Sequence, residues 1–207
     1  MKYLSHNELI RNLTEQEIED LIRQRISVRP NDVLQKVVTR LKPEVKNIVE
    51  IGTWRGVSAL VMASCENVEH IYTFDIDSSY FPRELWEKFG LENKITHTIL
   101  PNSFEIYKVI EKLDFDFAYI DGSHETEDET NDFMFLKTQC DKILADDTDD
   151  DRVFEIFKLY DAQRISFRFA IWMKNNDYSI VDEIKKDLVW DEPYGKLDFR
   201  HLSVKEI

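Results

Sequence analysis

The chain changes character at residue 46, and this change constrains its fold more than any other feature. From there to residue 160, apolar runs of strand length alternate with segments of helical periodicity. Strands with nearly continuous apolar residues are typical of parallel sheets that helices cover on both faces. The sequence therefore predicts an α/β fold with an open, mostly parallel sheet between two layers of helices.

The expected elements alternate regularly through this segment. Strands are expected at 47–51, 70–74, 95–100, 115–120 and 142–145. Helices are expected at 57–63, 81–89, 104–113, 128–136 and 153–160. The order contains no internal repeat and no Gly/Ser-rich linker, so residues 1–207 are expected to form a single domain.

The two ends of the chain are less regular. Residues 14–26 and 33–41 carry apolar stripes at helical spacing, which predicts an N-terminal helical cap over residues 1–45. Three later segments are candidate strands, namely 164–173, 178–184 and 197–204. We expect two of the three to pair at one edge of the sheet and to supply an antiparallel edge strand.

Charge and composition exclude several classes of partner. The 27 Lys and Arg residues against 41 Asp and Glu residues give a formal net charge of −14, which disfavours binding to nucleic acid phosphates. No secretory signal and no apolar stretch of bilayer length is visible, so a cytoplasmic protein without a membrane partner is expected. Cys65 and Cys140 lie far apart in apolar segments, which favours free thiols.

Ligands of open α/β sheets bind at the carboxyl ends of the strands, and the residues there predict a nucleoside-containing ligand. Glu50 lies near the end of the first strand, and the following turn holds Gly52 and Gly56, two of only five glycines in the chain. This spacing differs from the Gly-x-Gly-x-x-Gly turn of dinucleotide-binding proteins, which argues against a dehydrogenase. Asp75 ends the second strand, where a carboxylate can accept hydrogen bonds from both ribose hydroxyls.

The third strand is followed by Asn102 and Ser103, which open a helix. Both residue types favour helix capping, and at this position they can also contact the base of a nucleoside. The two functions are compatible, so the sequence leaves both open.

Carboxylates follow the fourth and fifth strands, at Asp121 and at Asp146 and Asp147. Neighbouring parallel strands would bring these side chains together, and with no Lys or Arg expected beside them they would repel one another. A divalent cation such as Mg²⁺ would remove that repulsion. The alternative is a solvated acidic loop, because the acidic run continues to Asp151. His124, on the same loop as Asp121, is placed to accept a proton.

These segments together resemble the class I S-adenosylmethionine-dependent methyltransferases, and in particular the metal-dependent small-molecule O-methyltransferases of the macrocin and catechol types. Segment 49–56 (VEIGTWRG) is similar to the first family motif and segment 72–75 (YTFD) to the second. Segment 119–124 (YIDGSH) resembles the macrocin-like branch, and 144–148 (LADDT) the metal-binding strand end of the catechol type. The resemblance implies a three-layer Rossmann-like fold.

The resemblance also implies roles for individual residues. The residues implied in cofactor binding are Glu50, Gly52, Thr53, Gly56, Ser58, Asp75, Asn102, Ser103 and Asp121. The implied metal ligands are Asp121, Asp146 and Asp147, and the implied catalytic residues are His124 and Asp121. The expected reaction is methyl transfer from S-adenosylmethionine to a hydroxyl of a small molecule or sugar, assisted by Mg²⁺. A homo-oligomer is possible.

Two departures from the family pattern leave alternatives open. The chain has QCDK at 139–142, where the family usually has a Gly-Gly turn, and Asp147 stands where the catechol type often has Asn. A metal-independent methyltransferase on the same fold is one alternative. A non-catalytic protein that binds S-adenosylmethionine is the other.

Overall fold

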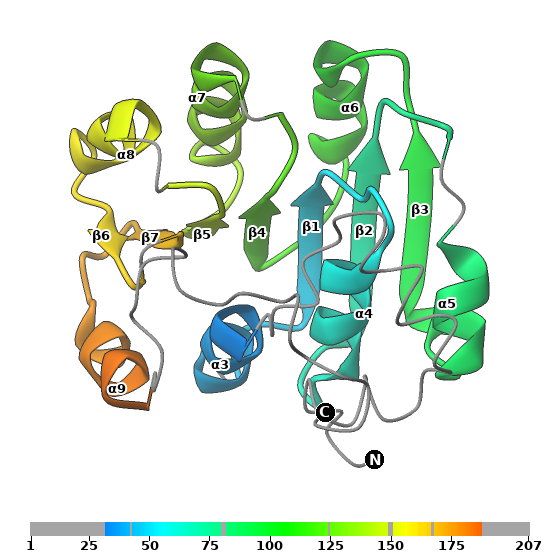
Figure 1. Ribbon diagram of the computed structural model, residues 1–207, viewed down its shortest axis with the longest axis horizontal. Helices are drawn as coiled ribbons and strands as arrows, with labels where there is room; N and C mark the ends of the chain where they lie inside the picture. The colour runs from blue at the N-terminus through cyan, green and yellow to red at the C-terminus, as the bar shows by residue number, and fades with distance from the viewer. Residues whose placement is uncertain are drawn as a thin grey trace, which may run out of the picture.

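The computed structural model describes residues 32–41, 43–79, 82–123, 125–148, 151–166 and 168–187. Its centre is a seven-stranded sheet with the strand order β3-β2-β1-β4-β5-β7-β6 (Figure 1). The strands are β1 (Asn47–Ile51), β2 (His70–Asp75), β3 (Ile95–Ile99), β4 (Phe117–Ile120), β5 (Lys142–Ala145), β6 (Gln163–Arg164) and β7 (Ala170–Met173). The first five are mutually parallel, whereas β7 is antiparallel to β5 and β6 is antiparallel to β7.

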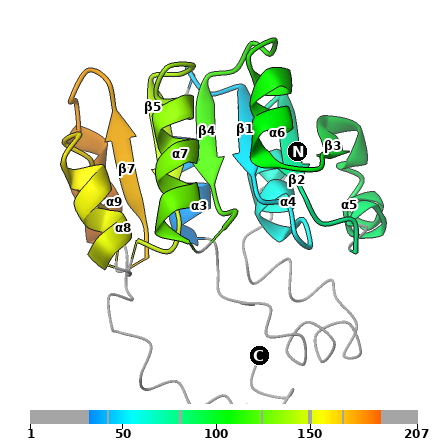
Figure 2. The same cartoon turned by 90° about the horizontal axis from the view of Figure 1, so that it is seen from above.

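Helices cover both faces of the sheet, which gives three layers (Figures 1 and 2). On one face lie α3 (Asp32–Arg40), α4 (Val57–Ser64) and α9 (Ser179–Asp187). On the other lie α6 (Ser103–Ile110), α7 (Thr126–Leu136) and α8 (Asp151–Lys158). The short α5 (Arg83–Lys88) and a 3₁₀ turn (Glu92–Lys94) precede the edge strand β3.

Strand β4 shows how alternate side chains divide the interior into two cores. Phe117 and Tyr119 belong to the core on the α3 and α4 face, while Ala118 and Ile120 belong to the core on the α6, α7 and α8 face. All four are buried, as expected for a central strand of a covered parallel sheet. The same alternation in β1 places Glu50 on the face of Tyr119, its register partner.

The fold class predicted from the sequence is confirmed: a mostly parallel sheet with an antiparallel edge and helices on both faces. The expected strands 47–51 and 142–145 match β1 and β5 to the residue. The other three parallel strands and the five interior helices also exist where the sequence predicted them, with ends that shift by up to three residues.

The prediction for the C-terminal segments needs one correction. The antiparallel edge forms as expected, but its two strands do not come from two of the candidates. Residues 163–173, which include the first candidate and one residue before it, fold back as the β6–β7 hairpin. Segment 178–184 is not a strand and lies mostly in helix α9, because its apolar residues Val181 and Ile184 are three apart and are both buried on one helical face. The third candidate, 197–204, lies outside the described residues.

Helix α3 packs against α4 and α9, so this part of the expected N-terminal cap belongs to the helical layer on that face of the sheet. The remainder of the cap before Asp32 lies outside the described residues, and the cap and the single-domain boundary stay predictions. Cys65 and Cys140 are both free and buried, which agrees with the expected free thiols. Within the described ranges, no helix has the length and apolar character needed to cross a bilayer.

Candidate active site

The carboxyl ends of β1, β2, β4 and β5 meet at one edge of the sheet, and the predicted site residues gather there in two groups. The first is the turn after β1, residues 52–56, which we call the glycine turn. The second is the acid cluster, which consists of Asp121 after β4 and of Asp146 and Asp147 after β5. The parallel pairing of β1 with β4 and of β4 with β5 brings the two groups together.

Gly52 is the point at which these two groups touch. Its φ of +99° is a conformation that residues with a side chain rarely adopt. A Cβ added here would lie 1.9 Å from the backbone carbonyl oxygen of Asp121. A glycine is therefore required here, because the backbone of the neighbouring strand end lies directly against it.

Gly56 is required by a different neighbour. Its φ is +71°, and a Cβ would lie 2.5 to 2.7 Å from atoms of Pro82 and Trp86. The indole Nε1 of Trp86 donates a buried hydrogen bond of 2.8 Å to the carbonyl oxygen of Gly56. The glycine turn is therefore packed against α5 as well as against the start of α4.

Asp75 ties the glycine turn to the end of β2. Its Oδ2 accepts hydrogen bonds from the backbone amides of Thr53 (3.0 Å) and Trp54 (2.6 Å). Its Oδ1 accepts from the amides of Ile76 (2.7 Å) and Asp77 (2.9 Å). The carboxylate is half-buried at the site edge, so it shapes the turn from the position where the sequence predicted a ribose contact.

Glu50 is fully buried beneath the glycine turn. The hydroxyl of Thr73 donates a short hydrogen bond to its Oε2, and the hydroxyls of Thr73 and Thr53 lie 2.6 Å apart. Oε1 has no hydrogen-bond partner among the described residues. Burial raises the pKa of Glu50 to about 7, although the hydroxyls of Ser58 and Thr73 favour the charged form. Such an orphaned carboxylate oxygen is ready to accept a donor from a ligand.

Asn102 has the capping role that its residue type favours. Its side-chain oxygen accepts a 3.0 Å hydrogen bond from the amide of Glu105, and Ser103 is the first residue of α6. Both residues lie at the carboxyl end of β3, and their predicted contact with a base stays a prediction.

The acid cluster is held together by a tyrosine that the sequence analysis did not single out. The hydroxyl of Tyr119 lies 3.3 Å from Oδ2 of Asp121 and 3.2 Å from Oδ2 of Asp146. A tyrosine has one hydroxyl proton, so the two carboxylates share a single donor. Tyr119 is fully buried. Its position on β4, two residues before Asp121, is the sequence feature that could have indicated that its side chain lies on the same face of the strand as Asp121.

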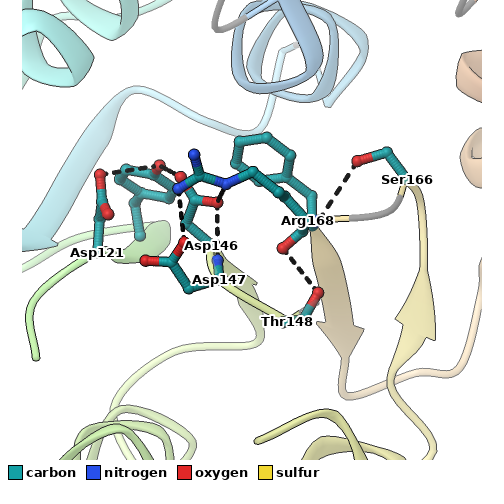
Figure 3. A network of polar contacts seen from close by, with 8 residues as sticks. Asp121, Asp146, Asp147, Thr148, Ser166 and Arg168 are labelled. Atoms are coloured by element: carbon teal, nitrogen blue, oxygen red, sulfur yellow. Dashed lines mark hydrogen bonds and ion pairs between the residues drawn. The ribbon is translucent and has the colours of Figure 1, made fainter. Parts of the chain in front are cut away.

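Arg168 corrects the premise that the acids lie away from any basic side chain (Figure 3). Its Nε donates to Oδ1 of Asp146 and a terminal nitrogen donates to Oδ1 of Asp147, each at 2.7 Å. The guanidinium therefore bridges two of the three carboxylates. Arg168 lies in the connection between β6 and β7, more than twenty residues further along the chain. No local sequence pattern predicts its contact with these acids.

The electrostatics of the cluster follow from burial and from the excess of negative charge. Burial is the largest cause that raises the pKa of Asp146, to about 6, and Arg168 opposes it. The pKa of Asp121 lies well above its usual value, first because of burial and then because Asp146 and Asp147 face it. One guanidinium does not fully compensate three converging carboxylates.

The donor chemistry of the acid cluster fits a divalent cation, since carboxylate oxygens are the ligands that Mg²⁺ and Ca²⁺ prefer. The arrangement is not that of a preformed metal site, however. Across the described residues, no group of three or more His, Cys, Asp or Glu side chains is set to hold a metal ion. Arg168 instead takes one oxygen each of Asp146 and Asp147. The predicted metal ligands thus stay a prediction that requires Arg168 to withdraw.

The predicted catalytic base, His124, lies outside the described residues. Its neighbours Ser123 and Glu125 are described, and the amide of Glu125 donates a 3.1 Å hydrogen bond to the hydroxyl of Ser123. This turn connects Asp121 with the start of α7. Its role as a base stays a prediction.

Comparison of the sequence with family models gives one match. Residues 49–147 match the model described as a methyltransferase domain. The match begins in β1 and ends in the acid cluster, and so it contains every predicted site residue. No curated protein matches the chain in a sequence search.

Solved structures with this fold include several O-methyltransferases. An O-methyltransferase from Bacillus cereus, solved with SAH, superposes with a TM-score of 0.59 at 14% identity over 78% of this chain and 92% of its own. TomG from Streptomyces achromogenes, solved with SAM, gives 0.54 at 15% identity over 67% and 78%. A candidate O-methyltransferase from Klebsiella pneumoniae gives 0.61 at 17% identity over 80% and 89%. Residues 49–147 therefore carry a methyltransferase sequence pattern on a methyltransferase fold.

Proposed function

We propose that this chain is an S-adenosylmethionine-dependent O-methyltransferase that acts on a hydroxyl of a small molecule or sugar. The observation that carries the proposal is the contact between its two groups of site residues. Gly52, in the turn that resembles the cofactor motif, packs against the backbone carbonyl of Asp121 in the acid cluster. A cofactor at the glycine turn would thus lie beside carboxylates suited to an acceptor hydroxyl.

The glycine turn fits the cofactor in charge and in hydrogen-bonding capacity. S-adenosylmethionine supplies an electrophilic methyl group on a sulfonium. Glu50 offers an orphaned buried oxygen, and Asp75 offers a half-buried carboxylate at the end of β2. Both would favour a ligand with a cationic ammonium and ribose hydroxyls. Two O-methyltransferases with this fold are solved with SAM or SAH, which supports S-adenosylmethionine as the cofactor.

The acid cluster and the loop after it would serve the acceptor. A divalent cation held by Asp121, Asp146 and Asp147, most simply Mg²⁺, would lower the pKa of a bound hydroxyl. His124 would take the hydroxyl proton. The acceptor oxygen would then form a bond to the methyl carbon as the carbon–sulfur bond breaks, which leaves S-adenosylhomocysteine.

Small hydroxylated molecules are the acceptor class that the charge pattern favours. The net charge of −14 disfavours a nucleic acid acceptor. Sugar hydroxyls, catechol-like phenols and small natural products all offer the hydroxyl that the reaction needs.

Metal-independent transfer on the same fold is the second candidate, and one observation favours it. Arg168 already places a permanent positive charge against Asp146 and Asp147, as a metal would. In that case the acceptor would be positioned without a divalent cation, and His124 alone would remove its proton.

Methyl transfer from labelled S-adenosylmethionine to a panel of hydroxylated metabolites tests the proposal. Asp146→Ala is expected to lower the rate by more than about 100-fold, since outer contacts of metal sites alone cost roughly 10–100-fold. Asp141→Ala is the matched control, because Asp141 lies one residue before the same strand, is 64% exposed and pairs with Lys174 in a surface ion pair.

Two further results decide between the candidates. Loss of wild-type activity in a chelator, with recovery on addition of Mg²⁺, supports the metal-assisted reaction. Activity that persists in the chelator replaces it with the metal-independent one. Transfer that Asp146→Ala leaves unchanged contradicts the assignment of the acid cluster to the acceptor side.

A further inference from the structure

Glu50 is a fully buried acid whose hydrogen-bond donors are neutral hydroxyls. Thr73 donates to its Oε2, and the hydroxyl of Thr53 lies 2.6 Å from that of Thr73. The hydroxyl of Ser58, at the start of α4, also favours the charged form of Glu50. Oε1 has no hydrogen-bond partner among the described residues. This oxygen is therefore an acceptor that a ligand with a donor group would satisfy.

The charged groups that face Glu50 are themselves acids. Asp75, at the end of β2, raises the pKa of Glu50 through its negative charge, and Asp121, after β4, interacts with Glu50 in the same repulsive way. Tyr119 is the register partner of Glu50 on β4 and is neutral, because its pKa lies well above the usual value. His97 lies further along the same row of the sheet, on β3, and burial lowers its pKa. None of these groups supplies a positive charge at neutral pH.

An acid in these surroundings has two ways to be neutralised. It can hold a proton, or it can face a cation that comes with a ligand. In the cofactor-free protein the first applies, since burial raises the pKa of Glu50 to about 7. A substantial fraction of the protein therefore carries a proton on this side chain at neutral pH.

The place of Glu50 makes the second way available. Thr53 belongs to the glycine turn, and its hydroxyl joins the turn to Glu50 through Thr73. Ser58 lies two residues after the same turn. S-adenosylmethionine and S-adenosylhomocysteine both carry an ammonium group on their amino acid part, and an ammonium is a charged donor that suits a carboxylate oxygen. The orphaned oxygen of Glu50 thus fits such a ligand at the glycine turn.

We propose that Glu50 recognises the ammonium group of the cofactor and gives up its own proton when that group binds at the glycine turn. The carboxyl O–H bond breaks, the proton passes to solvent, and the ammonium keeps its charge and donates to the freed carboxylate. The identity of the ligand rests on the proposed function. The proton exchange is a further property, because a carboxylate that is already charged in the free protein would bind the same ligand without releasing a proton.

Calorimetric titration of the full chain with S-adenosylhomocysteine, in buffers of different ionisation enthalpy, counts the protons released per bound ligand. With a free-state pKa of about 7, we expect release of about 0.7 proton at pH 6.5 and about 0.1 at pH 8. The matched ligand is 5′-methylthioadenosine, which keeps the nucleoside and lacks the ammonium. It is expected to release less than about 0.1 proton at either pH.

Two variants assign the proton to its residue. Glu50→Gln is expected to abolish the release that S-adenosylhomocysteine causes. Asp132→Asn is the matched control, because Asp132 is also a buried acid, with a pKa raised to about 6. It lies on α7, on the opposite face of the sheet, where the hydroxyl of Tyr107 donates to it at 2.6 Å. This control is expected to release as many protons as the wild type.

Three results overturn the proposal: binding of S-adenosylhomocysteine without proton release, equal release by 5′-methylthioadenosine, and release that Glu50→Gln retains. Affinities of the wild type cover the case in which the variants do not fold. The affinity for S-adenosylhomocysteine is expected to rise more than about tenfold from pH 5.5 to pH 7.5, and that for 5′-methylthioadenosine less than about twofold. A parallel rise for both ligands also overturns the proposal. Absence of S-adenosylhomocysteine binding overturns the proposed function with it, so the two failures can be told apart.

Discussion

The two halves of the site differ in the kind of group that contacts their carboxylates. Around the glycine turn, Glu50 and Asp75 are met by neutral donors, hydroxyls for the first and backbone amides for the second. Around the acid cluster, Asp146 and Asp147 are met by the charged guanidinium of Arg168. One half thus has neutral hydrogen-bond donors as its partners, whereas two acids of the other half are paired with a cation.

This difference indicates which kind of partner each half is built to receive. Neutral donors orient a carboxylate and leave its charge available to a cationic ligand, which suits a sulfonium cofactor. A guanidinium instead compensates the charge of the carboxylates that it bridges. The halves are also neighbours, because Glu50 and Tyr119 are register partners on β1 and β4.

The largest expected effect breaks the contact between the halves. Gly52→Ala would place a Cβ 1.9 Å from the Asp121 carbonyl oxygen at a φ of +99°. We expect a loss of about 4 kcal/mol in the free energy of unfolding, from left-handed strain together with overpacking. Denaturant unfolding followed by circular dichroism measures it.

Gly90→Ala is the control for that change. Gly90 has a φ of +66°, but no atom lies within 4 Å of the added Cβ. The expected cost is about 1 kcal/mol, from backbone strain alone. Equal losses in the two variants would mean that the strand ends do not constrain each other as described.

The next effect concerns Glu50, in the half whose partners are neutral donors. The folded-state pKa of Glu50 is raised from 4.5 to about 7, so the native protein holds this proton more tightly than the unfolded chain. Stability from this group is fully present below pH 4.5 and is lost as the pH rises through 7. Glu50→Gln should therefore match the wild type near pH 4 and exceed it at pH 8 by about 3 kcal/mol.

Glu50→Gln should also bind the cofactor less well. This second measurement distinguishes an acid that contacts the cofactor from an acid that only affects stability. S-adenosylhomocysteine affinity is expected to fall about tenfold, since a charge-assisted hydrogen bond would be lost. Glu69→Gln, at an exposed surface pair with Lys46, serves as the control and should change neither quantity by much. A stability gain that does not depend on pH would contradict the account of Glu50.

The smallest expected effect concerns Asn102, which follows the end of β3. Asn102→Ala removes the cap of α6 and should cost about 1 kcal/mol of unfolding free energy. Glu125 precedes α7 without a side-chain capping bond, so Glu125→Ala should change stability by less than about 0.5 kcal/mol. If Asn102→Ala also weakens cofactor binding severalfold, the residue contacts the ligand as well as the helix.

The sequence predicted the parallel part of the fold well, because short, mostly apolar runs such as Asn47–Ile51 and Lys142–Ala145 have few alternatives to a buried strand. It was less informative near the C-terminus. Segment 178–184 holds apolar residues that suit either an alternating or a helical pattern, and packing of Val181 and Ile184 in the core decided for the helix.

The site shows the same division between local and distant information. The acids at strand ends were predicted, since their position follows from strand boundaries. Arg168 was not, because its contact with Asp146 depends on how the β6–β7 hairpin folds back beside β5. The need for a glycine at position 52 could not be predicted either, because it comes from contact with the backbone at the end of another strand. Contacts made only through tertiary structure leave no periodic trace in the sequence.

Calorimetric titration with S-adenosylhomocysteine in a metal chelator tests the central claim most directly. The account predicts saturable binding of one molecule per chain, weakened in Asp75→Ala and unchanged in Arg168→Gln, because only the glycine-turn half receives the cofactor. Absence of binding by the wild type would contradict the assignment, and so would equal weakening by both substitutions.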